Sequence, residues 1–246
     1  MRPVEKLEPG SFVTYRNSSD EEVRHKILED YSTYGEAKAP LAANIGQYCS
    51  YCECKCALAN LEVEHIEPKG DGGSETAWGN FLLGCKICNT VKPKKMSGKT
   101  YHLPHQNNTF MDFVYDRTGR IAVNSDIPKV SRRNAQNLLD LLGLQRYPSE
   151  DKPSECDFRW KERVEAWRTA TIQLKAYTQG SLDEDDIISV AKVVGHWSIW
   201  FTVFKGQDSV LERLISDFEG TCTRCFNSSN HYVPIYRNPM NAEDPV

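Results

Sequence analysis

The chain has 246 residues, of which 39% are hydrophobic and 26% are charged, and its formal net charge is −4. A chain of this length can bury one substantial core or two small ones. No apolar run approaches the roughly 20 residues that span a bilayer, and the opening Met1-Arg-Pro-Val is not a secretory sequence, which argues against membrane and secreted proteins. We therefore expect a cytoplasmic protein that does not bind membranes.

Residues 1–47 are predicted to form an N-terminal extension that contains one helix. Ser19 or Asp20 can cap a helix over residues 20–31, because their side-chain oxygens accept hydrogen bonds from a first helical turn. Apolar side chains within this stretch share one face at helical spacing. This extension leads into the part of the chain that is richest in cysteine.

Residues 48–127 are predicted to form a small module of strands, loops and one short helix. A strand carries His65, and the loop Lys69–Ser74 after it is rich in glycine. The short helix starts near Cys88, and Pro93 limits its length. The module is expected to end in a β-hairpin over residues 110–124, because alternating apolar runs flank the turn sequence Asp116-Arg-Thr-Gly119.

Residues 128–246 are predicted to be helical. Capping residues and apolar spacings predict four helices. They are residues 132–142 between Ser131 and Gly143, Ser154 to about Tyr177, the residues after the capping box Ser181–Glu184, and residues 209–218. The aromatic run from Trp197 to Phe204 also has helical spacing and is expected to line a core. The C-terminal region is also expected to bind a partner protein, with Trp197, Trp200 and Phe204 as apolar anchors if they are exposed. No internal repeat or long linker interrupts the chain, so we expect this region to pack on the module as one α+β unit.

Two cysteine pairs, Cys49-Ser-Tyr-Cys52 and Cys85-Lys-Ile-Cys88, are separated by 32 residues. Four thiolates at this spacing supply the tetrahedral set that a structural zinc ion requires. Cys54 and Cys56 crowd the first pair, so a register in which one of them replaces Cys52 is an alternative. His65 is not needed by the zinc.

The remaining cysteines are expected to be reduced thiols. Cys222 and Cys225, together with His231, form a half-site of three possible ligands, and a second zinc ion would need a fourth from elsewhere. Cys156 has no visible partner in the sequence.

Five short motifs follow one another between residues 49 and 89. They are Cys49-Ser-Tyr-Cys52, Glu64-His65-Ile66, the glycine-rich loop, Asn80-Phe-Leu-Leu83 and Cys85-Lys-Ile-Cys88-Asn89. This order resembles the four-cysteine zinc branch of HNH endonucleases. The resemblance implies a zinc-stapled ββα-metal module that hydrolyses phosphodiester bonds. The alternative is a catalytically silent zinc-stapled subunit that binds nucleic acid or acts as a scaffold.

His65 is the natural general base, because a neutral imidazole with a pKa near 6.5 accepts a proton at physiological pH. The resemblance implies that Asn80 holds the loop that presents this base, and that Asn89 offers a carbonyl oxygen to a hard cation. Glu64 would be the second protein ligand, and oxygen ligands favour magnesium or manganese. In a regular strand, however, Glu64 and His65 face opposite sides. Either the regular strand ends here, or Glu64 does not bind the cation itself and contacts a residue that does.

The segment from Thr76 to Met111 contains no acidic residue but is rich in lysine. The lysines expected to contact the nucleic-acid backbone are Lys86, Lys92, Lys94, Lys95 and Lys99. Such contacts give affinity that does not depend on base sequence. A solvated lysine loop is the alternative.

Longer stretches around and beyond the five motifs allow a more specific comparison. They are Met1-Arg-Pro-Val-Glu-Lys-Leu-Glu-Pro9, Tyr48–Glu53, Val63–Lys69, Trp78–Leu83 and Leu103–Phe110, and more loosely Gly195–Phe204 and Gly220–Phe226. These stretches resemble PtuB-type proteins, the HNH nuclease subunits of Septu and retron-associated antiphage defence systems. The resemblance implies an ABC/SMC-like, PtuA-type ATPase partner, and in some systems retron-derived nucleic acid. The chain itself lacks a phosphate-binding loop. A stand-alone restriction-type nuclease is the alternative.

Overall fold

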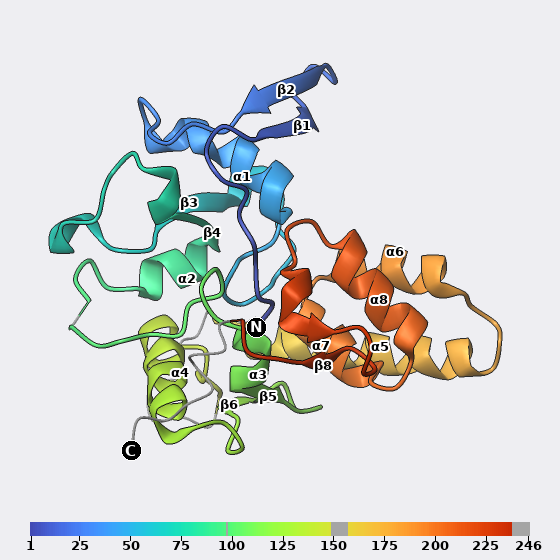
Figure 1. Cartoon of the computed structure of the whole chain (residues 1–246). Helices are drawn as coiled ribbons and strands as arrows, with labels where there is room; N and C mark the ends of the chain where they lie inside the picture. Colours follow the sequence, from blue (N-terminus) through green and yellow to red (C-terminus); the bar gives the residue numbers. More distant parts are fainter. Residues whose placement is uncertain (97, 149–156, 238–246) are drawn as a thin grey trace.

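The computed structural model describes residues 1–96, 98–148 and 157–237, and it combines helices with short strands (Figure 1). Within these residues the strands pair into four separate two-stranded antiparallel sheets. The pairs are β1 (Phe12–Arg16) with β2 (Glu22–Lys26), β3 (Leu61–His65) with β4 (Phe81–Cys85), β5 (Phe113–Tyr115) with β6 (Ile121–Val123), and β7 (Phe226–Asn227) with β8 (Val233–Pro234).

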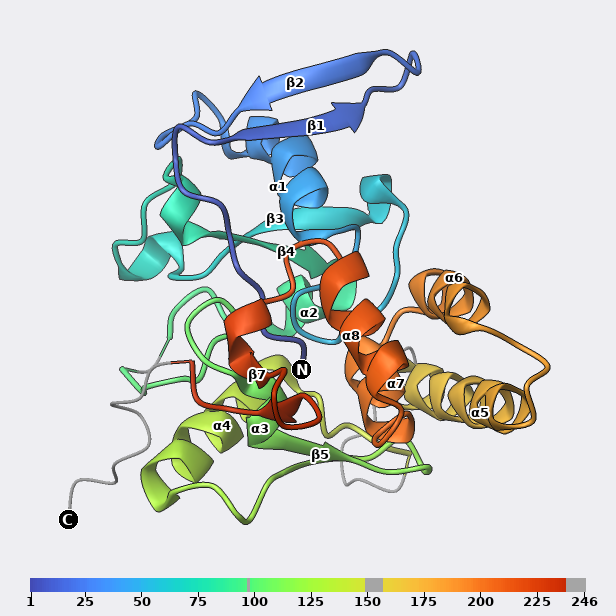
Figure 2. The same ribbon diagram turned by 45° about the vertical axis from the view of Figure 1, so that its right-hand side comes forward.

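Six of the eight α-helices of the described residues fall into two groups in space. The eight are α1 (Lys38–Ile45), α2 (Lys86–Val91), α3 (Thr109–Asp112), α4 (Lys129–Leu142), α5 (Arg159–Thr178), α6 (Glu184–Val194), α7 (Trp197–Val203) and α8 (Asp208–Asp217). In Figures 1 and 2, α5 to α8 gather on one side of the molecule, and α1 and α2 lie with the first four strands on the other. A mixed helix and strand fold is therefore confirmed.

The N-terminal extension forms a β-hairpin, so the helix expected over residues 20–31 is wrong. The side-chain oxygen of Asn17 accepts hydrogen bonds from the backbone N–H groups of Ser19 and Glu21, at 2.9 and 3.0 Å, and closes the turn. Asp20 lies within this turn at a positive φ of 60° instead of capping a helix. Burial alternates along both strands, which is the two-residue period of strands with one covered face.

The pair β3–β4 leads directly into α2 (Figure 1). α2 begins at Lys86, two residues before the expected start, because the sulfur of Cys85 accepts a hydrogen bond from the Cys88 N–H and caps the helix. It ends at Val91, and Lys92 is extended. A residue that precedes a proline disfavours the helical conformation, so Pro93 explains this end.

The predicted β-hairpin after the module is present as β5 and β6, but its first strand starts late. Asn108 caps α3 by accepting a hydrogen bond from the Phe110 N–H at 3.3 Å, so residues 109–112 turn into a helix before the strand begins. The hairpin turn packs tightly against α5. A Cβ atom on Gly119 would lie 2.1 Å from the carbonyl oxygen of Trp160, so only glycine fits there.

The helices after Pro128 match the expected set with shifted ends. α4 begins at Lys129, and Ser131 is buried inside it instead of capping it, whereas Gly143 ends the helix as predicted. α5 begins at Arg159, and the expected start at Ser154 lies outside the described residues.

The capping box of α6 lies two residues after the expected one. Asp183 accepts a hydrogen bond from the Asp186 N–H at 3.0 Å, and the Asp186 carboxylate accepts one from the Asp183 N–H at 3.2 Å. Ser181 and Glu184 do not form the box, because the chain turns into the helix only after Asp183. A capping box therefore starts α6 as predicted, but Asp183 and Asp186 form it in place of Ser181 and Glu184.

Two hydrophobic clusters make up the core. One is formed by residues between Met1 and Leu144, and the other by Tyr48 together with residues 170–226. Trp197, Trp200 and Phe204 belong to the second cluster and are at most 1% exposed, which confirms their packing role. They are therefore not available as exposed anchors for a partner protein. No helix of the described residues has both the length and the apolar character needed to cross a membrane.

The N-terminal segment lies between the two groups of elements (Figure 2). The buried guanidinium group of Arg2 donates hydrogen bonds to the carbonyl oxygens of Ile45 at 2.6 Å and Glu219 at 2.8 Å. Glu53, also buried, accepts a hydrogen bond from the Ser198 hydroxyl at 2.7 Å. These contacts fix the C-terminal helices against the part of the chain that carries the expected site.

Candidate active site and metal centre

Four cysteine sulfurs converge at the point where β4 meets α2. The Sγ atoms of Cys49, Cys52, Cys85 and Cys88 all lie within 4.8 Å of one another, and all four side chains are buried. Among the described residues this is the one cluster of its kind. Four thiolates in this arrangement suit a structural zinc ion, because zinc prefers a closed tetrahedral set of sulfur ligands.

The other cysteines do not join this cluster. Cys54 and Cys56 lie 3.2 Å apart at their sulfurs and are partly buried, so the alternative zinc register is not adopted. His231 is exposed and its ring contacts Asp208 at 2.6 Å. It forms no three-ligand group with Cys222 and Cys225, which are buried free thiols. Cys156 lies outside the described residues.

The cysteine cluster has a contact from the C-terminal helices. Arg159, the first residue of α5, is buried and donates a hydrogen bond from Nη1 to the sulfur of Cys88 at 3.2 Å. Its guanidinium group also donates to the carbonyl oxygens of Leu142 and Gly143, at 2.9 Å each, and pairs with Asp157 at 2.6 Å. A cation beside a metal thiolate stabilises the negative charge on the sulfur.

His65 is the last residue of β3, and its ring packs edge-on between two aromatic rings. The ring centroids lie 5.3 Å from Tyr34 and 5.2 Å from Phe81, the residue paired with His65 across the sheet. Nε2 lies 3.2 Å from the carbonyl oxygen of Glu75. A carbonyl only accepts hydrogen bonds, so Nε2 carries the proton and Nδ1 keeps its lone pair.

The protonation state of His65 agrees with a role as a base. Burial lowers the pKa of this imidazole below its ordinary value of 6.5, and the positive charges of Lys69 and Lys92 lower it further, although the Glu75 carbonyl acts in the opposite direction. The ring is therefore neutral at physiological pH and able to accept a proton at Nδ1.

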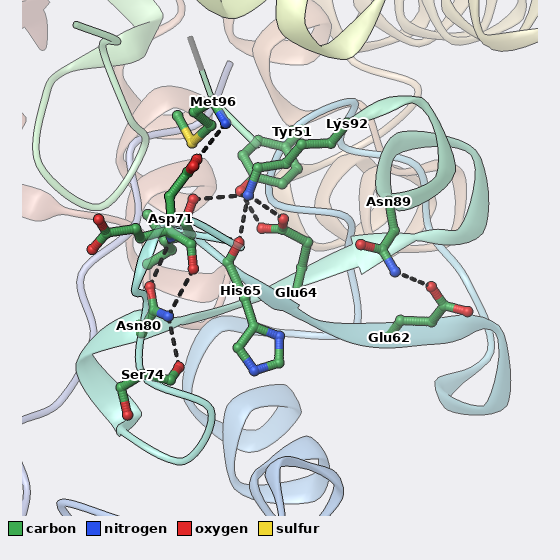
Figure 3. Close-up of polar contacts among 12 residues, drawn as sticks. Tyr51, Glu62, Glu64, His65, Asp71, Ser74, Asn80, Asn89, Lys92 and Met96 are labelled. Atoms are coloured by element: carbon green, nitrogen blue, oxygen red, sulfur yellow. Dashed lines mark hydrogen bonds and ion pairs between the residues drawn. The ribbon is translucent and has the colours of Figure 1, made fainter. Parts of the chain in front are cut away.

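Asn80 clamps the loop that follows His65. Its Oδ1 accepts a hydrogen bond from the Glu67 N–H at 2.8 Å, and its Nδ2 donates to the carbonyl oxygens of Glu67 at 3.0 Å and Ser74 at 2.8 Å. Figure 3 shows this amide between the two ends of the loop. The loop is also tight, since a Cβ atom on Gly73 would lie 2.0 Å from the Glu67 carbonyl oxygen. The clamp fixes the carbonyl of Glu75 that orients His65.

Glu64 points away from the ring of His65, as the alternation along a strand requires (Figure 3). It is 2% exposed, accepts a hydrogen bond from the Tyr51 hydroxyl at 2.5 Å and forms an ion pair with Lys92. Burial raises the pKa of Glu64 above its ordinary value, and the contacts with Lys92 and Tyr51 act against that shift. The carboxylate is thus held rigidly in the wall of the site.

Lys92 has its ammonium group inside the protein. Besides Glu64 it donates to the carbonyl oxygens of His65 and Ile66, the latter at 2.8 Å, and the residue is 8% exposed. This differs from the phosphate contact expected for it, because the buried carboxylate and two carbonyls occupy its donors.

Asn89 lies on α2 beside a carboxylate that the sequence did not single out. Its Nδ2 donates a hydrogen bond to Oε2 of Glu62, which leaves Oδ1 as a possible ligand for a cation (Figure 3). Glu62 and Glu64 are two residues apart on β3 and therefore share a face of the strand. This period was the only signal in the sequence that could have pointed to Glu62.

A cavity of about 540 Å³ joins most of these residues. Its walls include Glu64, His65, Asn89, Lys69, Lys92, Lys94 and Lys95. Lys94 and Lys95 are exposed, so their charges face an incoming polyanion. Lys99 lines a neighbouring cavity with Asp71 and Met96, and Lys86 is exposed outside both cavities.

The comparisons with known proteins agree with this arrangement. A family model described as HNH endonuclease matches residues 49–95, which contain the cysteine cluster, His65, Asn80 and Asn89. A protein of Vibrio cholerae serotype O1 biovar El Tor, named as an HNH endonuclease of retron Vc95, is 25% identical over 109 residues. The match covers 41% of this chain and 53% of that protein, so the chain spans about half of the length of this curated relative. The chain therefore carries an HNH endonuclease domain over residues 49–95.

Proposed function

We propose that the protein is a metal-dependent endonuclease of the ββα-metal type that hydrolyses phosphodiester bonds with His65 as general base. The observation that carries this proposal is the orientation of the His65 ring. The Glu75 carbonyl accepts the proton of Nε2, so Nδ1 keeps its lone pair on a ring that lines the same cavity as Asn89 and the lysines. In this role Nδ1 takes a proton from the attacking water.

The donor set of the cavity fits magnesium or manganese. Glu64 supplies a carboxylate and Asn89 an amide oxygen, and both line the same cavity as His65. The Lys92 ammonium group and the Tyr51 hydroxyl occupy the two carboxylate oxygens of Glu64, so Glu64 would have to give up one of these contacts to bind the cation. When bound, the cation neutralises charge that develops on the phosphoryl and leaving oxygens. Lys94, Lys95 and Lys99 contribute phosphate contacts around this centre, with Lys86 at its edge.

Plasmid nicking with and without Mg²⁺ or Mn²⁺ tests the nuclease mechanism. We expect His65→Ala to lower the cleavage rate by at least about 100-fold with zinc content and fold unchanged, because general base catalysis contributes roughly 10²–10⁴-fold. Asn89→Ala should keep its zinc and lose the activity that Mg²⁺ supports. The matched control is His231→Ala, which removes an exposed histidine far along the chain. Near wild-type nicking by His65→Ala would falsify the base assignment.

For the biological role, we propose an effector nuclease of an antiphage defence complex with an ABC/SMC-like ATPase. The proposal is supported by the resemblance to PtuB-type proteins and by the name of the Vibrio cholerae relative, which assigns that protein to a retron. The buried state of Trp197, Trp200 and Phe204 means that a different surface would contact the ATPase. Retron-derived nucleic acid would be a further component of such a complex.

Coexpression with an ATPase encoded beside this chain, followed by size-exclusion chromatography, tests the complex. We expect coelution, and we expect the ATPase to restrain nicking until it responds to infection. If the two proteins elute apart and the isolated nuclease cleaves at full rate, a stand-alone restriction-type enzyme is the better account.

A further inference from the structure

A second cavity, of about 430 Å³, also has His65 in its wall. It shares His65, Lys69 and Asn89 with the first cavity, so the two cavities are adjacent at the proposed base. Its other walls include Tyr34 and Lys38, which precede the residues matched by the HNH family model. The N-terminal extension therefore reaches the reactive centre.

Tyr34 presents its ring to this cavity from a firmly held backbone. The side chain is 47% exposed, although the ring edge contacts His65 and the Lys69 ammonium group lies 5.0 Å from the ring centroid. The turn that carries Tyr34 is anchored by Ala37, which is fully buried, and it continues into α1. An exposed ring on a rigid turn beside a catalytic group is a surface on which a planar ligand can stack.

The charged groups of the second cavity suit both parts of a nucleotide, the base and the flanking phosphates. Glu62 contributes a carboxylate to its wall, and a carboxylate repels a phosphate but accepts hydrogen bonds from the amino groups of bases. The cations, Lys38 and Lys69, lie at the same cavity. Lys69 is held 2.8 Å from Glu75 with its side chain 41% exposed, so it can still reach a backbone phosphate.

We propose that the second cavity is a nucleobase subsite in which the base next to the scissile phosphate stacks on Tyr34. Lys38 and Lys69 contact the phosphates that flank this base, and the scissile phosphate lies at His65 and Asn89. Stacking on an aromatic face accepts every base, so the subsite gives affinity with little sequence preference. The proposal rests on the nuclease function and adds how the substrate strand crosses the site.

The test uses a labelled DNA oligonucleotide whose cut position has been mapped. Its cleavage is compared with that of two derivatives, one with an abasic residue on each side of the cut. We expect Tyr34→Ala to raise KM with kcat nearly unchanged, so that kcat/KM falls about 5–150-fold, the range that corresponds to about 1–3 kcal/mol of base–aromatic stacking. Tyr34→Phe keeps the ring and should behave like the wild type. The matched control is Phe12→Ala, which removes an aromatic ring that is 49% exposed on β1.

The abasic substrates separate stacking from a structural effect on His65. At one of the two positions, the abasic residue should weaken cleavage by the wild type and have no further effect on Tyr34→Ala. If Tyr34→Ala equals the wild type on intact DNA, or loses the same factor on intact and abasic DNA, the subsite does not exist. A wild-type protein that cleaves no nucleic acid with either metal would instead overturn the nuclease mechanism itself. Zinc content and circular dichroism of each variant report its folding independently.

Discussion

The ion pair between Glu64 and Lys92 is a buried pair, and its disruption should cost far more than the loss of a surface contact. Both side chains are at most 4% exposed. We expect Lys92→Met to lower the free energy of unfolding by about 3–5 kcal/mol, because the carboxylate of Glu64 is left buried without its cation. Urea unfolding measures this loss.

The double variant Glu64→Gln with Lys92→Met is the matched control. It removes both charges, so it should recover a large part of the stability lost in Lys92→Met. If Lys92→Met is as stable as the wild type and weakens nucleic-acid binding instead, Lys92 contacts phosphate as its place in the lysine-rich segment suggested.

His105 gives the protein a pH dependence that is separate from the active site. Burial lowers its pKa from 6.5 to about 3, with Lys6 and Arg237 adding to the shift, and its Nδ1 has no hydrogen-bond partner among the described residues. The unfolded chain therefore binds a proton below pH 6.5, while the folded protein does not until about pH 3. The contribution of neutral His105 to the free energy of unfolding is fully present above pH 6.5. It is lost as the pH falls from 6.5 toward about 3.

His105→Gln should remove this pH dependence, because glutamine does not titrate. The free energy of unfolding of the wild type should fall more steeply between about pH 7.5 and about pH 5.5 than that of the variant, by at most about 1.4 kcal/mol per pH unit. The difference between the two proteins isolates His105 from other groups that titrate, such as the metal thiolates. Equal slopes would show that folding does not lower the pKa of His105.

At the residue scale, the sequence identified the cysteine pairs because their spacing alone specifies a metal site. His65 and Asn80 lie between those pairs and Asn89 directly follows the second pair, and the order of these motifs predicts their roles, which stay predictions. Glu62 and Tyr34 were missed for a physical reason: Glu62 meets Asn89 only after α2 folds back on β3, and Tyr34 reaches His65 from an element that precedes the module. Contacts between distant elements leave no local pattern.

At the scale of elements, the loop between β3 and β4 depends on Asn80. We expect Asn80→Ala to lower kcat by about 10–100-fold, because the loss of its three hydrogen bonds lets the Glu75 carbonyl drift and misplaces the His65 ring. Single-turnover cleavage at saturating metal measures this effect.

Asn124→Ala is the matched control for the loop. Its amide donates a similar hydrogen bond, 2.9 Å to the Met111 carbonyl oxygen, in a hairpin away from the site. It should change stability but leave kcat unchanged. A wild-type kcat for Asn80→Ala would mean that the glycine-rich loop holds its shape without the clamp.

The predicted elements are correct where the hydrophobic periodicity and the turn or capping residues indicate the same element. The hairpin β5–β6 and the helix α4 have strong turn and C-cap signals, and α4 ends at Gly143 as expected. The helix expected over residues 20–31 was wrong because Val23 and Ile27, four residues apart, fit both the helical and the two-residue period, and Leu28 is exposed. The side chain of Asn17 closes the turn between β1 and β2 and so favours a hairpin over a helix.

At the scale of the whole molecule, Arg159 joins the C-terminal helices to the cysteine cluster. We expect Arg159→Met to lower zinc affinity by about 10–100-fold, because groups that bond to metal ligands commonly contribute this much. Competition with a chelator measures the change. Arg168→Met is the matched control, since Arg168 is an exposed arginine on the same helix. Equal zinc affinity in both variants would show that the two parts of the chain are energetically independent.

The hydrogen bond from buried Arg159 to Cys88 limits how the domain can be moved into another protein. Residues 49–95 hold the four clustered cysteines and His65, the proposed general base, and could be taken for a domain that can be moved on its own. Yet the guanidinium group beside the cluster comes from α5, the aromatic wall beside His65 comes from Tyr34, and Glu53 is held by α7. A graft of this domain into another scaffold would expose these faces to water, so a transplantable nuclease would have to carry both flanking segments with it.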